Sequence, residues 1–123
     1  MSLIDLQKKI AEEERKYFRE ALRYASQIRE VAEELLNDKE LRVLVFGSTV
    51  RGDAIPGKSD IDILIVSEKA PTTPKQQAEL RTKILKSIGD LSAPFEIHVI
   101  TPEVYRRWYS GRIGKGGGVI EVR

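Results

Sequence analysis

The chain has 123 residues, of which 33% are charged and 41% hydrophobic, and its formal net charge is +2 at pH 7. This length suits one domain with its own core, and the small net charge argues against binding to nucleic acid through bulk charge. The absence of cysteine excludes disulfides and thiolate metal sites. No signal peptide and no apolar run of membrane length is visible, so we expect a cytoplasmic protein without a membrane segment.

Residues 3–36 predict a long N-terminal helix, because the segment lacks Gly and Pro and is rich in Ala, Glu, Leu, Lys and Arg. In its second half, apolar residues recur every three or four positions and form a face for a sheet: Tyr17, Ala21, Tyr24, Ile28, Val31 and Leu35. Charged residues separate this face from Leu3, Leu6 and Ile10. The pattern leaves open whether a second subunit covers these three side chains or whether they fold back onto their own domain.

Two apolar runs, Val43–Phe46 and Ile61–Val66, predict buried strands joined by a polar connection. Gly47 in this connection lets the backbone approach a triphosphate closely, and Ser48 is placed to cap a short helix whose N-terminus faces an anion. Arg51, one turn later, supplies a permanent positive charge. The connection therefore predicts a phosphate-binding loop.

Asp60 and Asp62 begin the second predicted strand and, two residues apart, lie on the same face of it. Two like charges held this close repel each other unless a cation lies between them. Carboxylates are the ligands that suit Mg²⁺ or Mn²⁺, which commonly bind together with substrate phosphates. Alone, the Gly-Ser pair could be a plain strand-to-helix turn, and the two aspartates could be a solvated strand end or turn. Their joint occurrence favours a site for a metal and a nucleotide.

The motif Gly-Ser-x-x-Arg-Gly, followed closely by Ser-Asp-Ile-Asp-Ile-Leu-Ile-Val, resembles the signature of the DNA polymerase β-type nucleotidyltransferase superfamily, in particular its minimal nucleotidyltransferase branch. The resemblance is strong over residues 46–66, and elsewhere it concerns the layout alone. It implies an α/β fold, with a small mixed β-sheet and helices packed mainly on one face. It also implies ATP or another NTP as substrate, bound with Mg²⁺ or Mn²⁺ by Gly47, Ser48, Arg51, Ser59, Asp60 and Asp62.

A second helix is predicted near Lys75–Ile88, and a third strand at Phe95–Ile100. Family members carry a third acidic residue on such a strand, and Glu96 is the position that matches. If this strand lies beside the second one, Glu96 joins the two aspartates as a metal ligand and as the catalytic base. The alternative is an ordinary solvated glutamate. We expect His98, on the same face, to be a partly buried structural histidine outside the site.

Thr101 and the proline after it predict a helix at 102–109, with Thr as its N-cap. The aromatic and basic residues at 105–115 would permit RNA binding, but we favour packing of the aromatic rings against the sheet. Several glycines predict a mobile tail at 111–123, in which Val119–Val122 can add an edge strand. We thus expect a nucleotidyltransferase domain at 1–110, with its catalytic core at 41–100.

These observations predict a metal-dependent nucleotidyltransferase that transfers a nucleoside monophosphate to an acceptor hydroxyl, and the resemblance implies AMP from ATP as the transferred group and a partner protein as the acceptor. A chain of this size has little room for an acceptor domain. The resemblance implies a separately encoded helical partner of the HEPN type, as in toxin–antitoxin pairs, and a second subunit is the other way to complete the cleft. The alternative function is a non-catalytic antitoxin that neutralises such a partner by binding. Paired carboxylates favour the enzyme, because they are costly in a pure binding surface.

Overall fold

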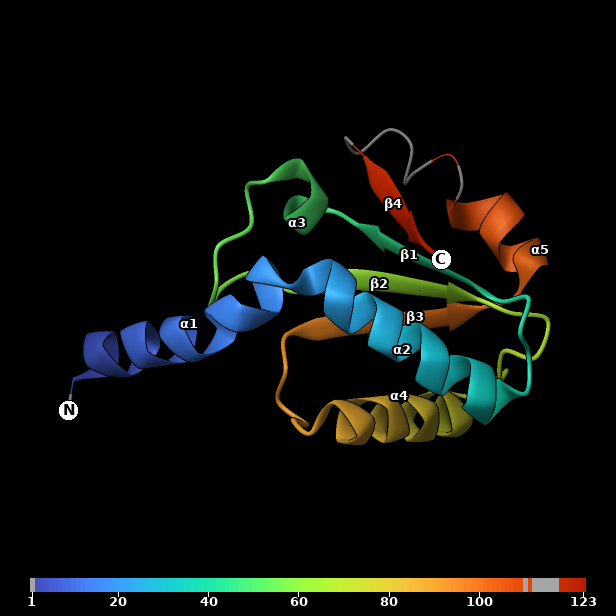
Figure 1. Ribbon diagram of the computed structural model, residues 1–123, viewed down its shortest axis with the longest axis horizontal. Helices are drawn as coiled ribbons and strands as arrows, with labels where there is room; N and C mark the ends of the chain where they lie inside the picture. Colours follow the sequence, from blue (N-terminus) through green and yellow to red (C-terminus); the bar gives the residue numbers. More distant parts are fainter. Residues whose placement is uncertain (1, 110, 112–117) are drawn as a thin grey trace.

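The computed structural model describes residues 2–109, 111 and 118–123. Its centre is a four-stranded mixed sheet with the strand order β3-β2-β1-β4 (Figure 1). β1 pairs antiparallel with both β2 and β4, whereas β2 pairs parallel with β3. The strands are β1 (Arg42–Phe46), β2 (Ile61–Val66), β3 (Phe95–Ile100) and β4 (Val119–Val122). The α/β fold with a small mixed sheet is confirmed.

Helices α2 (Ala21–Leu36) and α4 (Pro74–Ile88) form the helical layer over one face of the sheet (Figure 1). Ile28 of α2 and Ile84 of α4 are fully buried against the alternate residues of the strands that point to this face. The start of α4 is fixed by Thr73, whose side chain accepts a hydrogen bond from the backbone N–H of Gln76. The apolar faces predicted for both helices therefore build the main core.

The predicted helix over residues 3–36 is present, but it is interrupted at Glu20, which separates α1 (Leu3–Arg19) from α2. Tyr17 is buried just before the break, where its ring packs against Tyr24 and Phe95 with centroids 4.9 and 5.6 Å away. The Tyr17 hydroxyl donates a hydrogen bond of 2.7 Å to Asp90. These tertiary contacts anchor the end of α1, and no Gly or Pro marks the break in the sequence.

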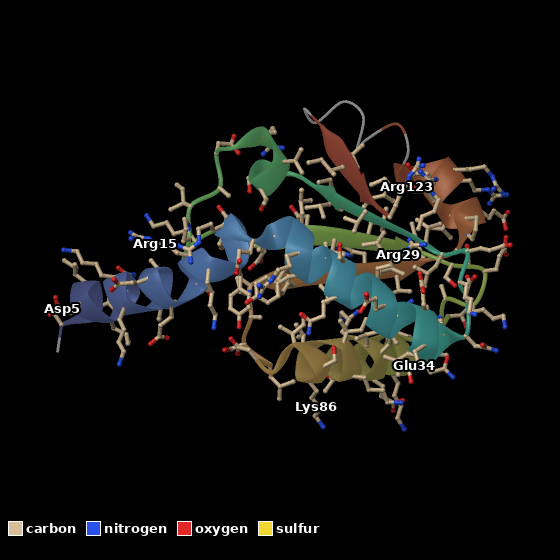
Figure 2. All side chains as sticks on the ribbon, in the orientation of Figure 1. Asp5, Arg15, Arg29, Glu34, Lys86 and Arg123 are labelled. Carbon is tan, nitrogen blue, oxygen red and sulfur yellow. The ribbon has the colours of Figure 1, made fainter. Side chains whose placement is uncertain are left out.

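Helix α1 extends beyond the sheet, with Asp5 near its outer end (Figures 1 and 2). Four of its apolar side chains are exposed, between 40% and 70%: Leu3, Ile4, Leu6 and Ile10. They therefore do not fold back onto the described part of the chain, and their burial by a second protein stays a prediction. Among the described residues, no helix is both long and apolar enough to cross a membrane.

The C-terminal segment adds α5 (Pro102–Val104) and strand β4. The Thr101 hydroxyl accepts a hydrogen bond from the N–H of Val104, as predicted for an N-cap. The helix expected at 102–109 continues from α5 as a π-helical turn, η1 (Tyr105–Tyr109). β4 completes the sheet beside β1, and Arg42 Nη2 lies 2.6 Å from Glu121 Oε1 across this pair. Residues 112–117, the glycine-rich part of the predicted mobile tail, lie outside the described residues.

Candidate active site

The candidate site lies on the sheet face opposite α2 and α4. This face has a small apolar cluster of its own, in which Leu44, Leu64 and Val66 are buried. Asp62 and Glu96 lie on the same face, because side chains alternate along a strand. They are also direct partners in the register of the parallel pair β2–β3. The structure therefore places two of the predicted carboxylates side by side.

The predicted phosphate loop is a single helical turn, α3 (Ser48–Arg51), that follows β1. Gly47 and not Ser48 is its N-cap, with φ 81° and ψ −152°, a conformation that favours glycine. Its carbonyl accepts the N–H groups of Val50 and Arg51, both at 3.1 Å. A Cβ added to Gly47 would overlap Oδ2 of Asp62. The loop backbone and the Asp62 carboxylate thus border one small space.

The pKa of Asp62 is raised to about 6, mainly because partial burial disfavours the charged carboxylate. Glu96 adds to this rise, both through a hydrogen bond between the two carboxyl groups and through its negative charge. The charge of Asp60 raises the pKa further, whereas that of Arg51 lowers it. Asp62 therefore lies close enough to Asp60, Glu96 and Arg51 for their charges to change its pKa.

The acidic residues suit partial ligation of a divalent cation. Asp60 and Glu96 are exposed, so both are open to a ligand from solvent. In the described part of the chain, no three acidic or histidine side chains gather tightly enough to hold a metal ion by themselves. Mg²⁺ commonly takes one or two carboxylates and leaves its other positions to water and substrate phosphates. The donor set at Asp60, Asp62 and Glu96 fits that mode, and their role as ligands stays a prediction.

Arg51 and Ser59 lie at the two ends of the loop between α3 and β2. Arg51 Nε is 3.5 Å from Asp53 Oδ2. The Ser59 hydroxyl accepts the N–H of Ile55 at 2.9 Å, and the Ser59 N–H donates to the Ile55 carbonyl at 2.8 Å. Ser59 thereby closes a tight turn directly before Asp60. Contact of either residue with a nucleotide stays a prediction.

His98 was expected to be a partly buried structural histidine outside the site, on the same face as Glu96, and the structure places it beside Glu96. Its Nε2 is 3.3 Å from Glu96 Oε1, and its side chain is 36% exposed. It is therefore partly buried, as expected, and it is a polar neighbour of the predicted base. The spacing of two residues within one strand was a sequence signal for this proximity.

One feature that sequence patterns do not reveal is the support of the loop by α1. The N–H of Gly57 donates a hydrogen bond of 2.8 Å to Glu14 Oε2. Gly57 has φ 85°, and a Cβ at this position would lie 3.2 Å from the Cα of Ala11. Close backbone packing between α1 and the loop therefore holds the segment that leads to Asp60.

A glycine loop beside a carboxylate pair on neighbouring strands of a small mixed sheet defines a candidate nucleotide-transferring α/β domain. Residues 25–114 match the family model described as "Nucleotidyltransferase domain". The match covers most of the chain, which therefore belongs to this family, and the resemblance seen in the sequence is confirmed. Transfer of a nucleoside monophosphate is the general activity of the family.

A similar protein from Methanocaldococcus jannaschii, provisionally named as a protein adenylyltransferase, is 37% identical over 73 residues. The aligned region covers 59% of this chain and 67% of that protein. A crystal structure provisionally described as a nucleotidyltransferase matches with a TM-score of 0.49 and 23% identity. It covers 78% of this chain and 94% of the other.

Proposed function

We propose that this protein is a metal-dependent nucleotidyltransferase that transfers AMP from ATP to a hydroxyl group of a protein. The observation that carries the proposal is the position of Asp62, which touches the Gly47 backbone on one side and pairs with Glu96 on the other. The provisional name of the archaeal relative supports ATP as the nucleotide and a protein as the acceptor.

The triphosphate is held by the loop. The open backbone at Gly47 and the Ser48 hydroxyl approach its oxygen atoms, and Arg51 neutralises part of its charge. Ser59 keeps the loop closed at its other end. Asp60, Asp62 and Glu96 would hold Mg²⁺ or Mn²⁺, which when bound would neutralise phosphate charge and favour the departure of pyrophosphate.

Glu96 acts as the base in the transfer step. It accepts the proton of the acceptor hydroxyl, and that oxygen forms a bond to the α-phosphorus of ATP. The bond between the α-phosphorus and the oxygen bridging to the β-phosphate breaks, and pyrophosphate leaves with the bonding electrons. His98, 3.3 Å from Glu96, is placed to share the proton. Catalysis by these residues consists mainly of positioning and charge neutralisation.

The test is transfer of label from ATP, labelled at the α-phosphorus, into macromolecules of a lysate of the source cells. We expect Mg²⁺-dependent label that protease removes and nuclease does not. Asp60→Asn and Asp62→Asn should each abolish it, whereas Asp5→Asn, near the outer end of α1, should leave it unchanged (Figure 2). Label that both active-site variants retain would contradict the assignment, and label removed by nuclease would make RNA the acceptor.

The second candidate is a non-catalytic antitoxin, favoured by the exposed apolar side chains of α1. On this view Leu3, Leu6 and Ile10 bind a helical partner of the HEPN type or a second copy of the chain. No label from any NTP, together with partner binding that Leu6→Glu removes, would support this function over the enzyme. Sedimentation of the protein alone would distinguish self-association from binding to another protein.

A further inference from the structure

The outer edge of β3 is the feature that the proposed reaction does not use. β3 is the last strand of the described sheet on its side (Figure 1). The Ile61 N–H donates to the Pro94 carbonyl, and the Ser67 N–H donates to the Ile100 carbonyl. In a parallel ladder, alternate residues face alternate neighbours, so the even-numbered residues of β3 bond to β2. The N–H and C=O of Ile97 therefore point away from the sheet, where no other described strand lies.

The two ends of this edge are already satisfied. The Phe95 N–H donates to the Ala93 carbonyl at 2.8 Å. At the other end, the side-chain amide of Gln77 donates to the Val99 carbonyl, also at 2.8 Å. The part of the edge left for another chain is therefore short and centred on Ile97. A free strand edge of this kind pairs readily with an extended peptide.

A groove of about 520 Å³ runs along this edge, between β3 and α4. Its helical wall includes Arg81, Thr82 and Leu85, and its strand wall includes Glu96 and His98. Arg81 has no ion-pair partner within the described part of the chain. The groove thus contains an open strand edge, one positive charge and apolar side chains, and all of them lie next to the predicted base, Glu96.

We propose that this groove binds an extended segment of the acceptor protein as an additional strand beside β3. This inference rests on the proposed function and specifies its acceptor. Side chains of an added strand alternate between the two faces, so every second one points toward Leu85 and the others lie beside Glu96. Cross-strand neighbours are about 5 Å apart at Cβ, which brings a Ser, Thr or Tyr hydroxyl within reach of Glu96.

The charges of the groove favour a peptide over RNA. Among the groove residues, Arg81 is the one with a permanent positive charge. The Glu96 carboxylate would repel the phosphate groups of RNA. An acidic side chain on the α4 side of the added strand would instead pair with Arg81. The recognised segment is therefore extended, with a hydroxyl residue on one face and apolar and acidic residues on the other.

The first test uses two synthetic peptides of roughly nine residues, long enough to span β3. Valine and threonine alternate in both, with a central tyrosine and one aspartate. In the second peptide, the amide nitrogen that would donate to the Ile97 carbonyl is N-methylated, which removes this hydrogen bond and places a methyl group against the strand edge but keeps the side chains. We expect the plain peptide to shift the backbone amide signal of Ile97 and to accept label from ATP. The methylated peptide should accept at least about tenfold less, and equal labelling of both would overturn the inference.

The second test fills the groove. Thr82 is exposed on α4 and lines the groove, so Thr82→Trp should occupy it. Gln76→Trp is the control, since Gln76 is equally neutral and exposed on the same helix but lies outside the groove. We expect Thr82→Trp to raise the KM for the peptide about tenfold and to leave ATP binding unchanged, while Gln76→Trp resembles the wild type. Unchanged peptide kinetics in Thr82→Trp would overturn the inference.

Two further outcomes separate this inference from the function on which it rests. If the wild type labels folded proteins or RNA but neither binds nor labels the peptides, strand docking is wrong and nucleotidyl transfer stands. If the peptide shifts the Ile97 amide but no NTP yields label on any acceptor, the docking site stands and the transferase function is wrong.

Discussion

The backbone of Gly47 lies against the carboxylate of Asp62, with no room between them for a methyl group. Gly47→Ala should therefore do two things. Its backbone conformation would cost about 1–3 kcal/mol of stability, and the new methyl group would displace Asp62 from the loop. We expect denaturant unfolding to show that loss and calorimetry to show loss of Mg²⁺-dependent ATP binding.

Gly89→Ala is the matched control, because Gly89 also has a positive φ, 90°, but a Cβ there would meet nothing within 4 Å. This variant should lose stability and keep full ATP binding. Normal ATP binding by Gly47→Ala would show that the loop and Asp62 do not form one site.

The raised pKa of Asp62 gives a prediction on pH. In the folded protein the Asp62 carboxyl group keeps its proton up to about pH 6, whereas an ordinary aspartate carboxyl group loses it near pH 3.8. Between these values the folded state binds more protons than the unfolded chain, so the free energy of unfolding contributed by this group falls as the pH rises. Glu96→Gln removes a negative charge from beside Asp62 and should lower its pKa. A carboxyl NMR titration without metal measures the change, and an unaltered Asp62 titration would contradict the coupling.

The hydrogen bond from Tyr17 to Asp90 should stabilise the junction of α1 and α2. It helps to hold the pKa of Asp90 below its ordinary value, after the larger effect of the Ser92 hydroxyl. Tyr17→Phe keeps the ring but should cost about 1.5–3 kcal/mol near neutral pH. Because folding lowers the pKa of Asp90, its carboxylate contributes fully to the free energy of unfolding above the pKa that it has in the unfolded chain. This contribution disappears as the pH falls through the lower pKa of the folded protein.

Urea unfolding of Tyr17→Phe should thus show a deficit near neutral pH that shrinks below about pH 4. Tyr24→Phe is the control, since its ring belongs to the same cluster and no described residue hydrogen-bonds to its hydroxyl. A deficit of equal size in both variants would show that the hydrogen bond to Asp90 is not its cause.

The bond between Glu14 and Gly57 should matter for activity more than for stability. Glu14→Ala removes the acceptor of the Gly57 N–H and should lower transfer about fivefold, the effect of one hydrogen bond, while unfolding changes little. Glu13→Ala, an exposed neighbour on α1, should behave as the wild type. Faster proteolysis within 53–59 in Glu14→Ala alone would report the loosened loop, and equal activity in the two variants would contradict this support.

The sequence predicted well those parts of the fold that local patterns determine. The strands β1, β2 and β3 and the helix α4 follow from apolar runs and periodicity, and the Thr73 and Thr101 caps follow from short-range hydrogen bonds. The pairing of Asp62 with Glu96 followed from strand alternation, once β3 was assumed to lie beside β2.

The remaining features depend on contacts between distant segments. The break at Glu20 coincides with the burial of Tyr17 against Phe95, far away in the sequence. The proximity of Gly57 and Glu14 depends on how α1 leaves the sheet, which no local pattern encodes.

Under the proposed function, the contact of α1 with the loop before Asp60 would make the N-terminal helix part of the catalytic apparatus. A protein that binds the exposed Leu3, Leu6 and Ile10 would act on the same helix that contacts Gly57 through Glu14. Its binding energy would then reach Asp60 and Asp62 through the contact between α1 and this loop. Relatives that share the strands and the motif but differ in this helix should therefore differ in how fast they turn over, even with identical residues around the nucleotide.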